Sequence, residues 1–175
     1  LQRVLDPDPD TERGTSRYGD TRKQGGVRDR ARGFGYTPIA PATGTMTTAR
    51  LSSLAIAKAV QQETHGLEAE LRKELDQGIW DAIAWLTANF SVDGNPVSGR
   101  GAFARPTPLW HYYYLYGLER VGSILGLRRI GSHDWYAEGA TYLVDVQDSL
   151  GAWGWQAQTA FALLFLTKAT APVTG

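Results

Sequence analysis

The spacing of apolar residues between positions 66 and 90 constrains the fold of this chain more than any other feature of its sequence. A repeat of three or four residues places apolar side chains on one face of an α-helix and the charged residues between them on the other faces. The apolar stripe consists of Leu67, Leu71, Leu75, Ile79, Ile83, Leu86 and Phe90. No segment alternates apolar and polar residues with a period of two, as a half-buried strand does. The sequence therefore predicts an all-α protein.

Four further segments have helical patterns, and these are of two kinds. Residues 134–148 are amphipathic, like residues 66–90. Residues 47–62, 109–126 and 156–169 are alanine-rich, aromatic or apolar on most sides, which is typical of buried helices. The predicted inward face of 134–148 carries Trp135, Gly139, Tyr142, Leu143 and Val146. Buried and half-buried helices are thus expected to alternate along the chain.

The composition excludes several classes of site. The chain has 175 residues, enough for one domain with a sizeable core, and no cysteine, so disulfides, thiolate nucleophiles and cysteine-ligated zinc are absent. Lysine plus arginine and aspartate plus glutamate both number 18, which gives no basic field for nucleic acid. The longest apolar stretch, Ala157–Leu166, is shorter than the about 20 residues that span a bilayer. No compartment is predicted.

Residues 1–45 differ from the rest of the chain. Prolines, glycines and charged residues dominate, and almost nothing apolar lies between Asp6 and Val27. Such a segment buries too little apolar surface to offset the entropy of ordering it. We predict a flexible polar segment at 1–45, followed by a helical domain at 46–175. The basic run 28–32 is interpreted as a solvated linker, with contact to an anionic surface as the alternative.

Two short patterns recur along the chain. Residues 84–86 (Ala-Trp-Leu) align with residues 141–143 (Thr-Tyr-Leu) at an offset of 57, and residues 34–36 (Phe-Gly-Tyr) echo residues 153–155 (Trp-Gly-Trp). A repeat of this length indicates stacked helical hairpins, none of which can bury its own apolar face. We predict a partial ring of roughly two and a half hairpins, an α-α toroid with the buried helices inside.

The predicted ring leads to an expectation about where four leucines lie. Leu115 and Leu163 belong to predicted inner helices and should be buried near the middle of the stack. Leu71 and Leu143 belong to predicted outer helices and should not fill that middle.

Residues 139–153 resemble the QW repeat of squalene–hopene cyclases and related triterpene cyclases. The resemblance extends over residues 132–169 and, with less agreement, over 47–126, where Phe90 stands at the glutamine position. It implies the α-α toroid fold that protein prenyltransferase β-subunits also have. Within the repeat, the glutamine amide is expected to bond backbone groups at neighbouring helix ends and to stack on the tryptophan. The positions that carry the motif are Tyr142, Leu143, Gln147, Gly151 and Trp153.

The catalytic groups of these families have no counterpart in the matching positions. Squalene–hopene cyclases protonate their substrate with an aspartate of a DxDD cluster, and this sequence contains no DxDD. Prenyltransferases hold zinc with aspartate, cysteine and histidine, and the three histidines here lack metal-ligand spacing. We therefore predict no catalytic residue, metal site or cofactor. Residues 110–120 and 131–136 also resemble toroid repeats of large bacterial proteins of planctomycete type, a resemblance that supplies no activity.

Two weaker groups of residues remain as candidates for a site. His133 and Asp134 form either an acid–base pair or, more ordinarily, the start of a helix capped by the aspartate. Aromatic residues at the ends of the predicted inner helices either line the cavity of the ring and hold an apolar or isoprenoid ligand, or pack in the core. These cavity-lining candidates are Trp110, His111, Tyr113, Tyr114 and Trp155.

Three functions fit these patterns. The first is a non-catalytic toroid module for binding or scaffolding. The second is a fragment of an isoprenoid cyclase or prenyltransferase whose catalytic residues lie outside this chain. The third is a toroid polysaccharide lyase or glycosidase, for which only Arg105, His111 and Tyr114 are candidates. The apolar flanks of a partial ring predict membership of a longer chain or self-association.

Overall fold

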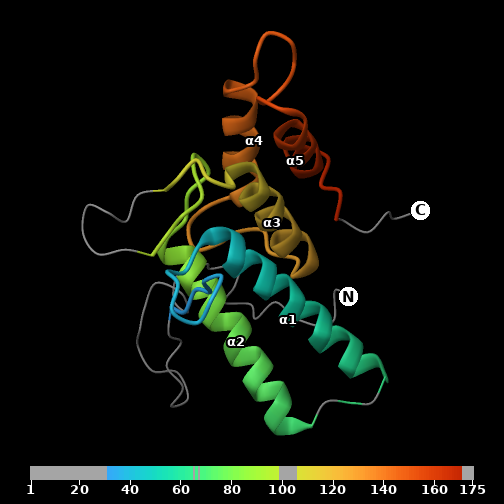
Figure 1. Ribbon diagram of the computed structural model, residues 1–175. Coiled ribbons are helices and arrows are strands. Elements are labelled where there is room, and N and C mark those ends of the chain that lie inside the picture. Colours follow the sequence, from blue (N-terminus) through green and yellow to red (C-terminus); the bar gives the residue numbers. More distant parts are fainter. Residues whose placement is uncertain (1–30, 65, 67, 99–105, 171–175) are drawn as a thin grey trace.

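The computed structural model of the protein describes residues 31–64, 66, 68–98 and 106–170. This part of the chain is all-helical and contains no strand, which confirms the predicted fold class (Figure 1). Only three isolated backbone bridges occur in it, such as Thr43 with Val97. The five helices are α1 (Gly44–Thr64), α2 (Ala69–Ala88), α3 (His111–Ile124), α4 (Trp135–Asp145) and α5 (Gln156–Leu166).

The helices pack in an order that differs from their order along the chain. Helix α3 lies between α1 and α5 and contacts both (Figure 1). Helix α2 packs against α1, and α4 packs against α3 and α5, whereas α2 and α4 do not contact each other. Helices α1, α3 and α5 therefore form a row of neighbours, with α2 and α4 packed beside it.

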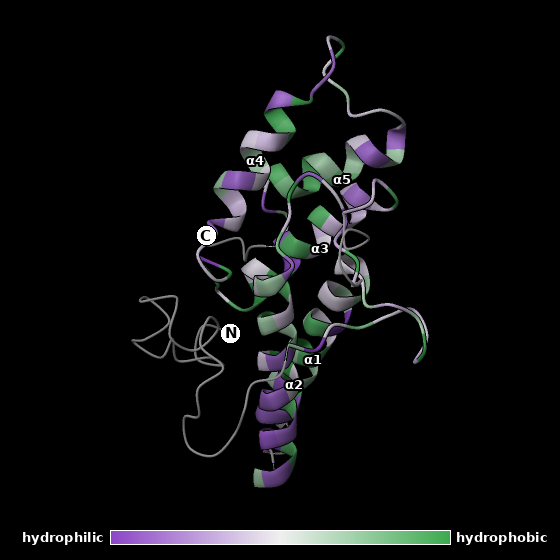
Figure 2. Ribbon diagram, turned by 90° about the vertical axis from the view of Figure 1, so that its left-hand side faces the viewer, coloured by the Kyte–Doolittle hydropathy of each residue, from purple (hydrophilic) through white to green (hydrophobic). Residues whose placement is uncertain are grey.

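Helix α3 contributes most to the core. Tyr114, Leu115, Leu118 and Val121 are fully buried, as the aromatic and apolar pattern predicts. On α2, the charged first half is solvated and Leu71 is 41% exposed, whereas its second half is buried. Figure 2 shows this change along α2 from hydrophilic to hydrophobic residues. None of the described helices is long and apolar enough to cross a membrane.

Two expectations about α4 and α5 are wrong. Leu163, predicted to be central, is 49% exposed, and only Ala162 and Phe165 of α5 are buried. Leu143, which belongs to the predicted inward face of α4, is fully buried. Helix α5 contacts only α3 and α4 among the described helices, so one of its apolar faces has no neighbour. Val146, placed on the inward face of α4, is 40% exposed because the helix ends at Asp145.

Small residues allow α1 and α3 to approach closely. A β-carbon added to Gly117 of α3 would lie 2.3 Å from the Thr48 hydroxyl oxygen, and one added to Gly44 would lie 2.5 Å from the Tyr114 ring. A β-carbon this close to a neighbouring atom would clash with it, so neither position admits a residue larger than glycine. These two contacts place the N-terminal ends of the two helices together, so α1 and α3 run side by side in the same direction.

The segments ahead of α1 and α5 bond to their helices in the same way. The Phe34 N–H donates to the Thr47 hydroxyl at 2.9 Å, and the Trp153 N–H donates to the Thr159 hydroxyl at 3.0 Å. Each threonine is the fourth residue of its helix. The echo between residues 34–36 and 153–155 thus corresponds to a shared local geometry.

Residues 31–43 belong to the segment predicted to be flexible, and several of them bond to the helical domain. Arg32 lies 3.4 Å from the buried Asp81 carboxylate, and its N–H donates to the Asp81 carbonyl at 3.0 Å. The Ser98 N–H donates to the Ala42 carbonyl at 2.7 Å. The remainder of the predicted segment, residues 1–30, lies outside the described residues.

We expect Gly117→Ala to lower the free energy of unfolding by about 1–3 kcal/mol, since the new methyl group forces Thr48 and the α1 backbone apart. Gly78→Ala is the matched control, because its β-carbon would meet only Leu54 Cδ1 at 3.4 Å. In the interior of α2 that change should stabilise the protein by up to about 1 kcal/mol. Urea unfolding of both variants measures the difference. Equal or increased stability of Gly117→Ala would contradict the close contact.

Candidate functional site

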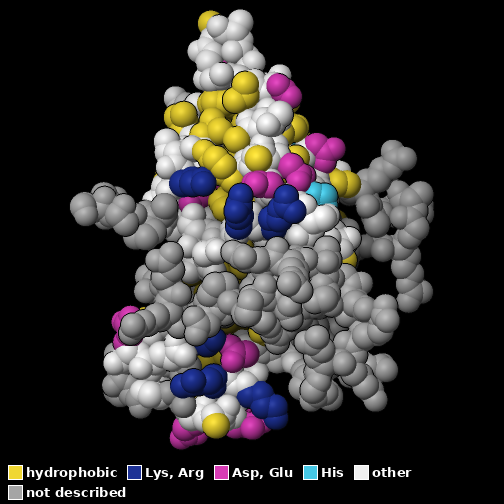
Figure 3. Space-filling view, turned by 180° about the vertical axis from the view of Figure 1, so that it is seen from behind, with side chains coloured by type: hydrophobic (Ala, Val, Ile, Leu, Met, Phe, Trp, Pro, Cys, Tyr) yellow, Lys and Arg dark blue, Asp and Glu magenta, His cyan; other side chains and the backbone are white. Residues whose placement is uncertain are grey.

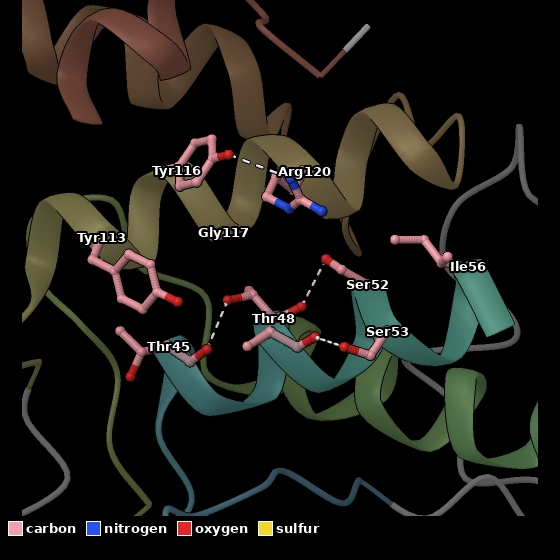
Figure 4. A pocket seen from close by; sticks show the side chains of 10 residues that line it. Thr45, Thr48, Ser52, Ser53, Ile56, Tyr113, Tyr116, Gly117 and Arg120 are labelled. Carbon is pink, nitrogen blue, oxygen red and sulfur yellow. Dashed lines mark hydrogen bonds between the residues drawn. The ribbon is translucent and has the colours of Figure 1, made fainter. Parts of the chain in front are cut away.

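A groove of about 300 Å³ runs between α1 and α3 (Figure 4). Its lining comes from one stripe of each helix, with residues three or four positions apart. Thr48, Ser52 and Gly117 are buried at its base, and the other side chains are partly or fully exposed apart from the buried Thr45. The lining consists of Thr45, Thr48, Ala49, Ser52, Ser53, Ile56, Tyr113, Tyr116, Gly117 and Arg120.

The α1 side of the groove presents hydrogen-bond acceptors. Thr48 and Ser52 each donate their hydroxyl proton to the carbonyl four residues earlier at 2.9 Å, and Ser53 does so at 3.0 Å. A hydroxyl has one proton and two lone pairs. Because the backbone of α1 accepts these three protons, the three oxygens can only accept hydrogen bonds from a ligand.

The α3 side presents hydrogen-bond donors. The Arg120 guanidinium donates to the Tyr116 hydroxyl at 3.3 Å, so the phenol keeps its own proton for another acceptor. Tyr113 and Tyr116 pack against Phe161 of α5, with ring centroids 5.3 and 5.6 Å apart. That contact fixes the two rings at the edge of the groove. Acceptors on α1 and donors on α3 therefore line the same groove, and in Figure 4 Tyr113 points toward α1 whereas Tyr116 points away from it.

The predicted cavity residues do not lie together around this groove. Tyr113 lines it, whereas His111 and Tyr114 are buried elsewhere on α3. Trp110 and Trp155 are 63% and 67% exposed at the N-terminal ends of α3 and α5. Burial raises the pKa of Tyr114 far above its ordinary value, and a hydrogen bond with the Ser91 backbone opposes that shift. Tyr114 thus has the environment of a core residue.

His111 is a buried, neutral imidazole. Its Nε2 donates to the Val92 carbonyl at 2.8 Å, because a carbonyl can only accept. Its ring lies 5.2 Å from those of Tyr112 and Tyr142. Burial lowers the pKa of His111, and the bond to Val92 and the charge of Asp93 oppose that shift. Burial also raises the pKa of Tyr112 and Tyr142.

His133 and Asp134 do not form an acid–base pair. Asp134 accepts from the Ala137 N–H at 3.0 Å and so caps α4 as the alternative interpretation predicts. His133 instead places its Nδ1 2.9 Å from the Glu138 carboxylate and stacks on Phe90 with ring centroids 4.1 Å apart. Arg105, the remaining candidate of the lyase interpretation, lies outside the described residues.

The QW-like residues stabilise the loop between α4 and α5. The Trp153 indole donates to the Leu143 carbonyl in the last turn of α4 at 2.7 Å. Gln147 donates to the Gly151 carbonyl at 3.0 Å, and Gly151 has a left-handed φ of +79°. We had expected the Gln147 amide to bond a neighbouring helix end. Its N–H instead bonds within its own loop. The tryptophan makes the bond to the helix end.

Sequence reasoning missed the polar lining of the groove. Thr45, Thr48 and Ser52 follow the helical spacing of three and four residues, and Arg120 follows Tyr116 by four. This signal is weak, because a stripe of small hydroxyl residues is equally compatible with a solvated helix face. Only the position of α3 turns the stripe into the side of a groove.

Comparison with protein-family models, curated proteins and solved structures found no match for the chain. In the part of the chain that the structure describes, no group of three or more histidine, aspartate or glutamate residues has the arrangement of a metal site. Function is therefore argued from the groove itself.

We expect the stability of the wild type, measured relative to His111→Gln, to fall as the pH drops below 6.5, the ordinary pKa of histidine. The unfolded chain takes up the proton first, so acid favours unfolding until the pH reaches the lowered pKa of folded His111. The slope is at most about 1.4 kcal/mol per pH unit. Urea unfolding of both proteins between about pH 5 and 8 measures it. A constant difference would show that His111 is not desolvated.

Proposed function

We propose that this chain is a non-catalytic helical-repeat module that binds a small polar ligand in the α1–α3 groove. The observation that carries the proposal is the opposition of acceptors on α1 and donors on α3 across one groove. A volume of about 300 Å³ falls at the lower end of ligand pockets, which suits a small molecule.

The chemistry of the lining supports binding rather than turnover. No aspartate, glutamate, histidine or lysine lines this groove. The serine and threonine protons are donated to helix carbonyls, so no general base stands beside a nucleophile. An isoprenoid has no donor for the free acceptor lone pairs of these hydroxyls. A polar ligand satisfies them.

The proposal includes a toroid-type stack of the helices, and their packing order supports it. Helices α1, α3 and α5 are neighbours while α2 and α4 do not touch, as inner and outer helices of stacked hairpins would be. The alternative of an isoprenoid cyclase or prenyltransferase fragment has the same helix order and places its catalytic residues outside this chain. It predicts an apolar ligand, so the choice of ligand distinguishes the two.

Methyl NMR on the full chain with ¹³C-labelled alanine tests the proposal. Ala49 lines the groove and Ala137 is exposed on α4, which makes it the control. We expect the Ala49 signal to shift on addition of hexoses, sugar acids or amino acids as probes, and to be unchanged with farnesol. A shift with farnesol and none with the polar probes would favour the cyclase alternative.

A second candidate role is scaffolding by self-association through the uncovered face of α5. Apolar side chains gather over the upper part of the molecule, where α4 and α5 lie (Figure 3). Leu150 is 91% and Leu163 49% exposed there. A face of this kind is typical of an interface.

For this role we expect Leu163→Glu to shift a monomer–dimer equilibrium towards monomer at least about tenfold, since a charge in the interface is costly. Sedimentation velocity measures it, with Thr141→Glu on the exposed side of α4 as the control. A wild-type chain that is monomeric at high concentration would exclude self-association.

A further inference from the structure

Arg120 is the one charged side chain in the lining of the groove. Its neighbour Glu119 faces away, because that buried carboxylate accepts from the Ser123 hydroxyl at 2.8 Å and from Thr170 at 2.7 and 3.2 Å. Within the described chain no aspartate or glutamate lies within salt-bridge distance of Arg120. The groove therefore offers a half-buried cation whose only polar contact among the described residues is the Tyr116 hydroxyl.

An unpaired guanidinium in a groove selects an acid group. Arginine binds planar carboxylates and phosphates through paired, charge-assisted hydrogen bonds, which are about twice as strong as neutral ones. Tyr116 already occupies one donor of the guanidinium. Figure 4 shows Arg120 across from Ser52, and Tyr113 near Thr45 at the other end. An acid group on Arg120 therefore leaves the rest of the ligand between the two tyrosines and α1.

The remainder of the ligand must supply donors. The Thr48, Ser52 and Ser53 oxygens can only accept, since their protons are bonded to the α1 backbone. Ligand hydroxyls meet this requirement without adding charge. A ligand ammonium would place a second positive charge beside Arg120, with no carboxylate in the lining to balance it.

We propose that the ligand of the α1–α3 groove is a small hydroxylated acid, a sugar carboxylate or a sugar phosphate. Its acid group pairs with Arg120, and its hydroxyls donate to the α1 oxygens. The ring of Tyr113 borders the C–H surface of the sugar. From Tyr113 to Arg120 is seven residues, or about 10 Å along the helix, which matches one monosaccharide with its acid group. This inference rests on the function proposed above and specifies its ligand.

Isothermal titration of the full chain with four probes tests the ligand class: glucuronate, glucose 6-phosphate, glucose and inorganic phosphate. We expect glucuronate or glucose 6-phosphate to bind at least tenfold more tightly than glucose and than inorganic phosphate. Whichever of the two acids binds better identifies the acid group. Loss of a charge-assisted pair corresponds to about tenfold or more in affinity.

Variants of Arg120 test whether the preference for an acid arises in the groove. Arg120→Gln should weaken the acid at least tenfold and leave glucose unchanged, and Arg120→Lys, which keeps the charge without the fork, should lie between. Arg128→Gln is the matched control, because Arg128 is exposed and outside the lining. Far-ultraviolet circular dichroism and the melting temperature verify that each variant is folded.

The outcomes separate the ligand class from the proposed function. The acid assignment is overturned if glucose binds as tightly as both glucuronate and glucose 6-phosphate, or if Arg120→Gln has no effect. A shifted Ala49 signal would still keep the groove as a binding site. Inorganic phosphate binding as tightly as the sugar acids overturns the hydroxyl assignment. An Ala49 signal that no polar probe shifts overturns both.

Discussion

The close contact between α1 and α3 determines the rest of this structure. Gly117 lies against Thr48, and Gly44 lies against Tyr114, so the two helices meet with almost no side chain between them on one side. On the other side the same contact brings Leu51 into the core with Leu115 and Leu118. Helix α3 is then held from three directions, by α1, α4 and α5.

This contact also explains why polar residues line a helix–helix junction. Threonine and serine are small enough for the approach, and the hydroxyl protons of Thr48 and Ser52 bond back to their own helix, so these two buried donors are satisfied. The acceptor oxygens that remain are tolerated where water or a ligand reaches them. A tightly packed helix pair and a polar groove are thus two consequences of one choice of residues on α1.

The aromatic residues divide into distinct roles that composition does not reveal. Tyr114 is enclosed in the core, His111 bonds the loop after α2 through the Val92 carbonyl, and Tyr113 borders the groove. They are consecutive or nearly so along α3, and a rotation of about 100° per residue sends each to a different neighbour. Trp153, by contrast, bonds the end of α4, the role that the sequence predicted for Gln147.

The sequence by itself determined which segments are helical and that the described part of the chain forms no strand, because periodicity is a local property set by the pitch of the helix. It also determined the Asp134 cap, whose carboxylate bonds three residues along the chain. Exposure of Leu163 was decided by tertiary structure, since an apolar face is buried only where a neighbour covers it. The groove was likewise decided there, because its two sides come from helices about 70 residues apart and only their packing brings Arg120 opposite Ser52.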